Sequence, residues 1–392
     1  MTREEYLISF CQSLIRTPSL SGQEEQVAKL IQATMLEQGF DEAIIDRNGS
    51  VLGCIHGSRP GKTILLDGHI DTVDISDRSR WVHDPYGAQI EDGKLYGRGT
   101  SDMKCSVGAM IMAAADFAKD CGKDFAGSIY VSGTVHEECF EGVSPRTITQ
   151  LCHPDCVIIG EATTTTLKIG QRGRAEVVVE TIGKTCHSSN PAEGVNAVYL
   201  MTALIDEIRK LQVSEHPVLG KGILELTDIV SSPYPGASVV PGLCRATFDR
   251  RLLVGETEED VLAPIQAIID DLKTRIPNFN ARVYLAEGNE QCWTGETIRA
   301  KRFFPAWLLP EDHWLVQAAS AGLREAGIEA PISHYDFCTN GSHFCGEAGI
   351  PSVGFGPSLE TLGHVIDEYI ELDQLTKAYH GFISILQKLT NA

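Results

Sequence analysis

Polar residues of the kinds that bind divalent cations or move protons directly follow several short apolar runs. One run ends in Asp67-Gly68-His69-Ile70-Asp71. Side chains two positions apart on an extended segment lie on the same side. His69 can therefore bind a metal ion while Asp71 accepts a hydrogen bond from its other ring nitrogen. A turn at a strand end with a hydrogen-bonded histidine is the alternative that this pair leaves open.

An acidic residue also follows a glycine-rich segment. Asp102 comes shortly after Gly97 and Gly99 and just before a stretch of small apolar residues that is typical of a buried helix. A carboxylate at this place could bridge two cations. It could equally cap the helix, because Asp is a favoured residue at that position.

Two adjacent acids, Glu137 and Glu138, end another apolar run. Neighbouring carboxylates repel each other, so we expect a compensating cation if both are buried. Adjacent side chains on an extended segment diverge, and one could bind a metal while the other acts as a general base. A solvated acidic turn is the alternative.

Two more candidate ligands complete the set. Glu161 follows the apolar run at 156–159, and His364 lies in a loop after a short apolar segment. Two histidines and three carboxylates, without a thiolate, suit a pair of Zn²⁺, Co²⁺ or Mn²⁺ ions. A single ion, with some of the acids merely structural, stays open. The candidate ligands are His69, Asp102, Glu138, Glu161 and His364.

The composition excludes several classes of protein. The chain has 392 residues, of which 43% are apolar and 22% charged, as in an ordinary globular protein of two to three domains. Acidic residues outnumber basic ones 53 to 33, and no basic stripe is present, which argues against binding to nucleic acid or anionic membranes. The N-terminal segment lacks a signal-peptide pattern, and the twelve scattered cysteines suggest reduced thiols. We therefore expect a cytoplasmic protein.

Alternating patterns predict the elements that position these residues. Residues 4–39 have helical periodicity, broken at 17–22, and Ser21 with Glu24 predicts a capping box for the second helix. Short apolar runs at 43–45, 51–55, 63–66, 129–134 and 156–159 predict strands, and 107–118 a helix. Helices at 313–326, 342–348 and 372–388, with a strand at 351–355, follow near the C-terminus. This alternation indicates an α/β sheet flanked by helices.

The pattern changes after residue 170. The order becomes strand, helix, strand, strand, helix, strand, at 174–182, 195–211, 223–230, 245–253, 256–275 and 281–285. This order is typical of a ferredoxin-like α+β module. We therefore predict a discontinuous α/β domain with a mixed, mostly parallel sheet at 1–171 and 291–392, and an inserted ferredoxin-like domain at 172–290.

In this order, and over essentially the whole chain, the motifs resemble the M20 family of metallopeptidases and deacylases. The family includes acetylornithine deacetylase, succinyl-diaminopimelate desuccinylase, aminoacylase and glutamate carboxypeptidase. The likeness is strongest to YgeY-type peptidases of the acetylornithine deacetylase group. The segments that carry it are Gly170-Gln171-Arg172-Gly173-Arg174, Phe248-Asp249-Arg250-Arg251-Leu252 and Phe337-Cys338-Thr339-Asn340-Gly341.

The resemblance implies a role for each candidate residue. His69 and Glu161 would bind one metal ion, His364 and Glu138 the other, and Asp102 would bridge them. Asp71 would orient His69, and Glu137 would be the general base. The inserted domain would serve as lid and dimerisation domain, with His187 reaching the partner subunit's site to steady the oxyanion and Arg251 contacting the substrate carboxylate. A capping or buried role in a turn is the alternative for His187.

One segment departs from the family pattern. Many relatives have an acidic residue in the loop that reads Thr339-Asn340-Gly341-Ser342 here. A loop of this composition that opens a helix can hold a carboxylate through its N–H groups, so Asn340, Gly341 and Ser342 are candidate substrate-binding residues. The departure leaves the metal ligands intact and affects the substrate assignment.

The function that follows is hydrolysis of an amide bond in a small N-acyl amino acid or dipeptide. It would depend on two divalent ions, with Zn²⁺ favoured over Co²⁺ and Mn²⁺, in a homodimer formed through the lid domain. A dipeptidase or carboxypeptidase of the same family and a non-catalytic relative that binds amino acids are the alternatives.

Overall fold

A nine-stranded mixed sheet forms the centre of the first of two units into which the chain divides. The computed structural model describes residues 1–391. The first unit contains Met1–Gln171, Asn289–Arg299 and the chain from Trp307 onward, and the second contains Arg172–Gly288 and Ala300–Ala306. We expected the inserted domain to end at 290 and the residues after it to belong to the first domain. In the structure, residues 300–306 belong to the second unit. The reason is that β19 (Phe303–Phe304) pairs with a strand of the second unit.

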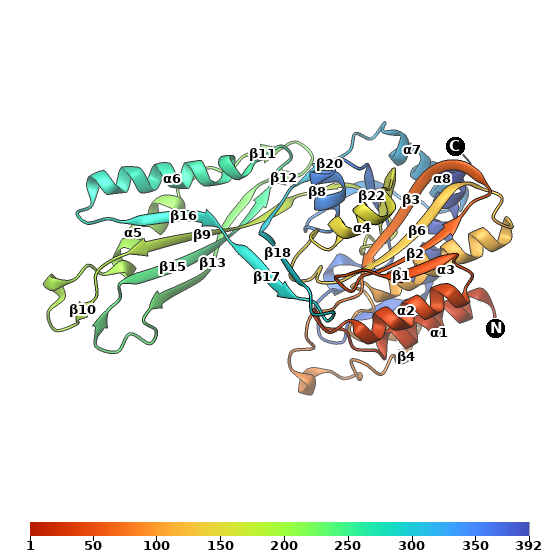
Figure 1. Ribbon diagram of the computed structural model, residues 1–392, viewed down its shortest axis with the longest axis horizontal. Coiled ribbons are helices and arrows are strands. Elements are labelled where there is room, and N and C mark those ends of the chain that lie inside the picture. The colour runs from red at the N-terminus through yellow and green to blue at the C-terminus, as the bar shows by residue number, and fades with distance from the viewer. Residues whose placement is uncertain (392) are drawn as a thin grey trace. The chain divides into compact units, whose positions relative to one another are not determined.

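The sheet of the first unit has the order β1-β2-β6-β3-β7-β22-β8-β20, with β21 beside β8. Figure 1 shows β1, β2, β6 and β3 side by side in this sheet. Its centre is parallel, because β3 runs parallel to β6 and β7, and β22 parallel to β7. Central strands such as β7 are buried along their whole length, as expected for a sheet covered on both faces. The strands are β1 (Glu42–Ile45), β2 (Val51–His56), β3 (Arg59–His69), β6 (Ala126–Thr134), β7 (Cys156–Ile159), β8 (Leu167–Gln171), β20 (Trp307–Leu308), β21 (Ile332–Tyr335) and β22 (Ser352–Gly354).

Helices flank this sheet, and the most deeply buried of them is α3 (Lys104–Asp120). Alanine, glycine and other small residues let α3 approach β3, α1 and α8 closely. A small three-stranded sheet also belongs to this unit and contains β4 (Ile90–Glu91), β5 (Lys94–Tyr96) and β23 (Tyr369–Glu371). A separate strand pair, β17 (Glu287–Gln291) with β18 (Thr297–Lys301), has residues in both units. The other helices are α1 (Arg3–Ile15), α2 (Glu25–Glu37), α4 (Pro145–Cys152), α7 (Trp314–Glu325) and α8 (Leu372–Thr390).

The second unit has the predicted ferredoxin-like order, and each strand pair in it is antiparallel. Its sheet runs β13-β15-β9-β16, with α5 and α6 packed on one another and on the strands. Short strand pairs, β10 (Cys186–His187) with β14 (Val239–Val240) and β11 (Glu215–His216) with β12 (Gly220–Lys221), lie outside this sheet. The main elements are β9 (Gly173–Ile182), α5 (Ala197–Ile208), β13 (Ile223–Ser232), β15 (Leu243–Leu252), α6 (Glu258–Arg275) and β16 (Ala281–Leu285).

The predicted fold class is confirmed, and two local predictions are corrected. The capping box at Ser21 is wrong: α2 begins at Glu25 with Glu24 as its cap residue, and the Ser21 hydroxyl instead donates to Asp71 Oδ2 at 2.7 Å. The expected helix at 342–348 is a π-helical turn, η3 (Ser342–Glu347). The elements α4, β8, β20 and β21 had no prediction.

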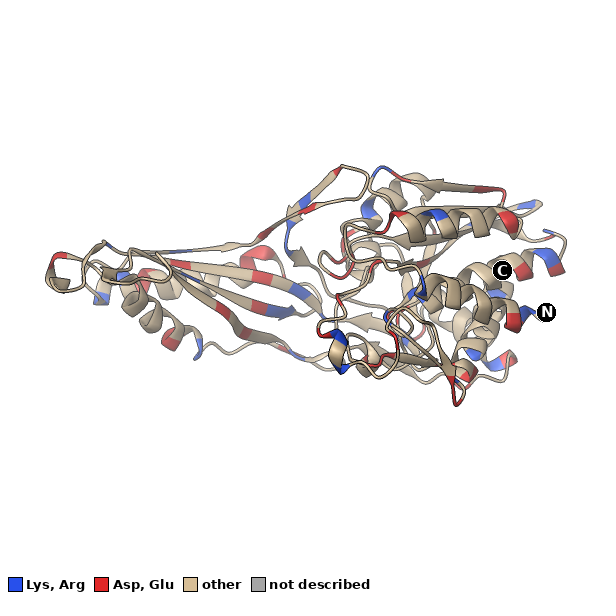
Figure 2. Ribbon diagram, turned by 90° about the horizontal axis from the view of Figure 1, so that it is seen from below, with Lys and Arg blue, Asp and Glu red and all other residues tan. Residues whose placement is uncertain are grey.

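The distribution of charged residues and the state of the cysteines agree with the composition of the sequence. Figure 2 shows acidic and basic positions interspersed along the helices and strands. All twelve cysteines are free thiols, and most are buried. None of the described helices combines the length and the apolar character that crossing a membrane requires.

Candidate metal centre

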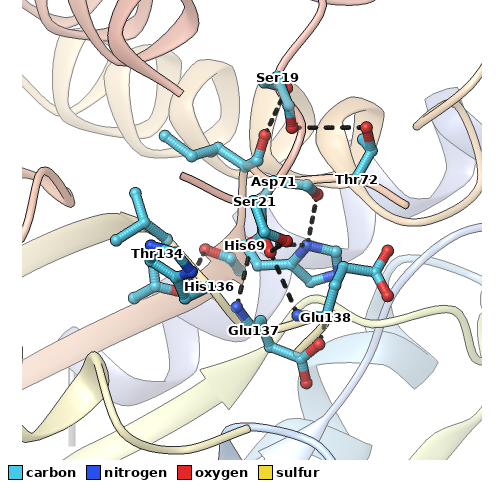
Figure 3. Close-up of polar contacts among 12 residues, drawn as sticks. Ser19, Ser21, His69, Asp71, Thr72, Thr134, His136, Glu137 and Glu138 are labelled. Atoms are coloured by element: carbon cyan, nitrogen blue, oxygen red, sulfur yellow. Dashed lines mark hydrogen bonds and ion pairs between the residues drawn. The ribbon is translucent and has the colours of Figure 1, made fainter. Parts of the chain in front are cut away.

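The candidate ligands gather because three parallel strands end at the same edge of the sheet. β3 pairs in parallel register with β6, His69 opposite Thr134, and with β7, Asp67 opposite Ile159. His69 is the last residue of β3, and the predicted acidic residues follow β6 and β7 within a few positions. Figure 3 shows His69, Asp71, Glu137 and Glu138 close together at this edge.

Asp102 lies between the two histidines. Its Oδ1 is 2.9 Å from His69 Nε2, and its Oδ2 is 3.2 Å from His364 Nε2. The alternative of a helix cap is wrong, because α3 begins at Lys104 with Met103 as its cap residue. A side chain at Gly363 would place a Cβ 2.8 Å from Asp102 Oδ2, so this carboxylate would have to move to accommodate any larger residue there. The two oxygens of one carboxylate thus face two imidazoles.

Each histidine has a further carboxylate beside it. Glu138 Oε2 lies 2.7 Å from His364 Nε2, and Glu161 Oε1 lies 3.6 Å from His69 Nε2. Glu137 Oε2 is 4.0 Å from His69 Nε2. Within residues 1–391, the buried Oε1 of Glu138 has no hydrogen-bond partner.

Asp71 connects this cluster to the surrounding backbone. Its Oδ1 accepts a hydrogen bond from the N–H of Glu137 at 3.1 Å, and its Oδ2 from the N–H of Glu138 at 3.2 Å (Figure 3). His69 Nδ1 lies 2.9 Å from the backbone carbonyl oxygen of Asp71 and 3.6 Å from Oδ1. The orientation of the imidazole therefore involves both the carbonyl and the carboxylate of Asp71.

The three glutamates of the cluster are buried in a way that disfavours their charge. Burial raises the pKa of Glu138 to about 7 and that of Glu161 to about 8. Burial also raises the pKa of Glu137 well above its usual value. Deprotonated carboxylates at this density need a positive charge among them.

The pKa values of the two histidines are also raised, which for an imidazole favours the charged form. Hydrogen bonds to Asp102 and Glu138 raise the pKa of His364 to about 10. Burial alone would lower the pKa of His69, but its contacts with Asp102 and Asp71 outweigh that effect and raise it. Both imidazoles thus lie among carboxylates that favour positive charge at this place.

The residues present fit divalent metal ions. Donor atoms of His69, Asp102 and Glu138 lie within 4.8 Å of one another, as do those of His69, Glu137 and Glu161. Nitrogen and carboxylate donors without thiolates are the set that catalytic Zn²⁺ and Mn²⁺ sites use. The unpartnered Glu138 Oε1 offers a further lone pair for a cation.

Two predicted residues belong to the second unit. His187, in β10, is exposed, and its Nδ1 lies 2.8 Å from Ser189 Oγ. Arg251, in β15, forms an ion pair with Asp249, Nε to Oδ1 at 2.8 Å. Their roles toward a substrate stay predictions.

The loop that departs from the family pattern is buried in the first unit. Asn340 donates from Nδ2 to Asp67 Oδ2 at 3.0 Å and to Thr134 Oγ1 at 2.9 Å, while its Oδ1 accepts the N–H of Gly142 at 3.0 Å. Its side chain is thus engaged with the protein itself. A substrate contact by the loop Asn340, Gly341 and Ser342 stays a prediction, and the backbone is the part of Asn340 that could make one.

The sequence analysis did not identify the residues that contact and support the candidate ligands. The hydroxyl of Ser21 supports Asp71, and the carboxylate of Glu368 contacts the loop that carries Asp102. The signal available for Glu368 was its place four residues after His364, next to a second acid, Asp367.

Comparison with known proteins decides the family. The sequence model of peptidase family M20/M25/M40 matches residues 65–388. The chain belongs to the M20 family. It is accordingly a metallohydrolase that acts on amide bonds.

Two relatives extend over nearly the whole M20 chain. The uncharacterized protein YgeY of Escherichia coli is 34% identical over 365 residues, covering 92% of this chain and 88% of its own. A succinyl-diaminopimelate desuccinylase of Cereibacter sphaeroides is 30% identical over 393 residues, covering 97% and 98%.

Solved structures share the fold at low sequence identity. The aminopeptidase PepT of Bacillus cereus has a TM-score of 0.76 at 17% identity, with 98% of each chain covered. A Bacillus subtilis protein described as a dinuclear metal binding peptidase of the M20 family has a TM-score of 0.68 at 13% identity, with 99% of each chain covered.

Proposed function

We propose that this M20 protein is a di-metal hydrolase that cleaves the amide bond of a small N-acyl amino acid or dipeptide. The observation that carries the proposal is the arrangement around Asp102. Its two oxygens face His69 and His364 at 2.9 and 3.2 Å, and each histidine has a terminal carboxylate beside it. This is the symmetry that a pair of ions bridged by one carboxylate requires.

In this proposal the five ligands divide into two sets with Asp102 in common. His69 and Glu161 would hold one ion, and His364 and Glu138 the other. The dinuclear description of the Bacillus subtilis relative supports two ions, and the donor set supports Zn²⁺ before Co²⁺ or Mn²⁺. When bound, the ions supply Lewis acidity, which polarises a substrate carbonyl and makes water more acidic.

Glu137 is the proposed general base. Its carboxylate is buried at the edge of the cluster, 4.0 Å from His69 Nε2, and its backbone is fixed by Asp71. Glu137 would take a proton from the water that attacks the carbonyl carbon and return it to the leaving amine nitrogen when the C–N bond breaks.

The second unit would supply the substrate contacts and the dimer. Arg251 would bind the substrate carboxylate, and His187 would steady the oxyanion in the partner subunit's site. The N–H groups at Asn340, Gly341 and Ser342 would contribute from the first unit. We propose a cytoplasmic homodimer, formed through the second unit, on the basis of the composition and the family resemblance.

The test is release of free amine from a panel of N-acetyl, N-succinyl and N-carbamoyl amino acids and of dipeptides. The assay is run with Zn²⁺, Co²⁺ or Mn²⁺ and against a chelated control, with bound metal counted in parallel. Metal-dependent hydrolysis is expected. The desuccinylase relative favours the N-succinyl compounds, and the aminopeptidase neighbour favours the dipeptides. If no compound of the panel is hydrolysed and no metal is bound, the proposal is contradicted and a protein that only binds amino acids is favoured.

A further inference from the structure

A buried ion pair lies behind the loops that carry the metal ligands. The side chain of Glu368 is 0% exposed and that of Arg98 is 2% exposed, and Arg98 Nη1 lies 2.6 Å from Glu368 Oε2. Two charges this far from water cost several kcal/mol unless they are paired and hydrogen-bonded. The ion pair satisfies only one oxygen of Glu368, so the other oxygen needs partners of its own.

The second oxygen of Glu368 binds the backbone of a single loop. Oε1 accepts hydrogen bonds from the N–H groups of Gly99, Ser101 and Asp102, at 3.1, 2.7 and 3.1 Å. Peptide N–H groups that converge on one anion fix the shape of a loop. Gly99 has a φ of +86°, which glycine adopts without strain. The carboxylate therefore holds the backbone of Asp102 directly.

The same residue is joined to the other ligand loop through the chain. His364 is four positions before Glu368, and its side chain is 53% exposed. A side chain so exposed has little packing to fix it, so its place depends on the backbone of residues 364–368. That backbone is anchored to the Asp102 loop, because the N–H of Gly97 donates to the carbonyl oxygen of Glu368 at 2.9 Å.

A neighbouring acid anchors the segment on its other side. The Asp367 carboxylate accepts the N–H of Val82 at 2.9 Å and the N–H of His83 at 3.0 Å. Residues 364–368 thus present one imidazole to the ligand cluster and use two carboxylates to hold two separate loops.

We propose that Glu368 is a positioning residue for the metal centre: its carboxylate, held by Arg98, fixes Asp102 relative to His364. It acts through the backbone of Asp102 and is not itself a ligand. The proposal rests on the proposed function in one respect, that Asp102, Glu138 and His364 hold one of the two ions. Loss of the Glu368 carboxylate should therefore weaken binding of the ion that His364 and Glu138 hold most strongly, and weaken binding at His69 and Glu161 less, through the shared Asp102.

The test is a titration of the metal-free full-length protein with Co²⁺. Binding is measured by calorimetry and by the visible absorption of the bound ion. Glu368→Gln keeps the size of the side chain but leaves one acceptor oxygen in place of two, so either the loop N–H groups or Arg98 must face an amide NH₂. We expect the affinity for one Co²⁺ to fall about tenfold or more, with a changed spectrum for that ion, as when outer partners of ligands are removed.

Asp116→Asn is the matched control. Asp116 is also a buried carboxylate paired with an arginine, at 3.2 Å from Arg3 Nε, and it accepts from the Tyr379 hydroxyl at 2.8 Å. It lies in α3, which follows the Asp102 loop, and it makes no contact with that loop among the hydrogen bonds of residues 1–391. We expect D116N to bind both ions as the wild type does.

The outcomes separate this proposal from the proposed function. Two Co²⁺ ions bound to E368Q with unchanged affinity and spectrum would overturn the positioning role and leave the hydrolase proposal standing. Two ions bound to the wild type without hydrolysis of any panel compound would contradict the hydrolase, and the E368Q titration would still decide the role of Glu368. Failure of the wild type to bind Co²⁺ would overturn both.

A second variant covers the case in which E368Q does not fold. Glu368→Asp keeps the buried charge beside Arg98 and withdraws the carboxylate from the loop by about one methylene. A weaker affinity for one ion supports the proposal, and unchanged affinity for both overturns it.

Discussion

The carboxylate of Asp71 holds the backbone of Glu137, whose N–H donates to Asp71 Oδ1 at 3.1 Å. The same carboxylate accepts the N–H of Glu138 at 3.2 Å and the hydroxyl of Ser21 at 2.7 Å. One side chain thus places the proposed base and a proposed ligand while it faces the imidazole of His69. Asp71 therefore does more than orient a histidine.

Replacing Asp71 by Asn should weaken the centre as a whole. Asn keeps one acceptor oxygen and turns an NH₂ toward donors that need an acceptor, so the Glu137–Glu138 backbone loses a partner. We expect metal affinity to fall about 10–100-fold, with a further loss of turnover at saturating metal. Ser21→Ala removes only one of the donors and should change both quantities much less. Equal effects of the two variants would contradict this view of Asp71.

Glu137→Gln tests the general base separately from metal binding. Gln has the shape of Glu but cannot take a proton, so kcat should fall about 10²–10⁴-fold. Metal content should equal that of the wild type. Glu141→Gln, in the same loop, is the control and should retain most of the turnover. A metal-loaded E137Q enzyme with kcat within a few-fold of wild type would remove Glu137 from the mechanism.

The gathering of the candidate ligands could be predicted in large part, because each of them follows a buried strand or lies in a loop next to one. His69, Glu138 and Glu161 come after apolar runs, and parallel strands bring such ends to one edge of the sheet. The ferredoxin-like unit was predictable for a similar reason, since its alternating strands and amphipathic helices have distinct periods. The spacing of apolar residues along a segment shows which of its side chains will be buried.

The features that could not be predicted depend on contacts between residues far apart in the chain, which leave no pattern in the local sequence. Ser21 has the spacing of a capping box, yet its hydroxyl binds Asp71, fifty positions away in the chain. Glu368 binds the N–H groups of a loop more than 260 positions earlier, and any sequence can offer N–H groups. The helix α4 is short and half of its residues are polar, and β8 contains Gly170, which breaks the apolar pattern of a strand.

Glu347→Gln should make stability less sensitive to acid. Glu347 Oε1 pairs with Arg146 Nη2 at 2.5 Å, and its Oε2 lies 2.8 Å from His343 Nδ1; these partners overcome burial and lower its pKa from 4.5 to about 2. A lowered pKa stabilises the fold above pH 4.5, and this contribution disappears as the pH falls toward 2. We expect E347Q to cost about 1–2 kcal/mol at pH 7, allowing for partial exposure.

Urea unfolding of the chelated protein between pH 3 and pH 7 measures this difference. The difference in free energy of unfolding between wild type and E347Q should decrease steadily as the pH is lowered. A gap that does not change with pH would mean that Glu347 contributes through packing and not through its charge.

Asn340→Asp tests whether an acid can replace the amide that lies beside Asp67. Asn340 Nδ2 donates to Asp67 Oδ2 at 3.0 Å, and burial already raises the pKa of Asp67 to about 6. A second carboxylate at this distance would force the pair to share a proton, so the folded variant should lose stability as the pH rises through that raised pKa. We expect N340D to be less stable than wild type by about 2–4 kcal/mol at pH 8 and by less at pH 5.5. Asn340→Ala loses the same hydrogen bonds without adding charge, so its deficit, measured by denaturant unfolding at both pH values, should vary less with pH. If N340D and N340A show the same pH dependence, repulsion by Asp67 is not what the amide avoids.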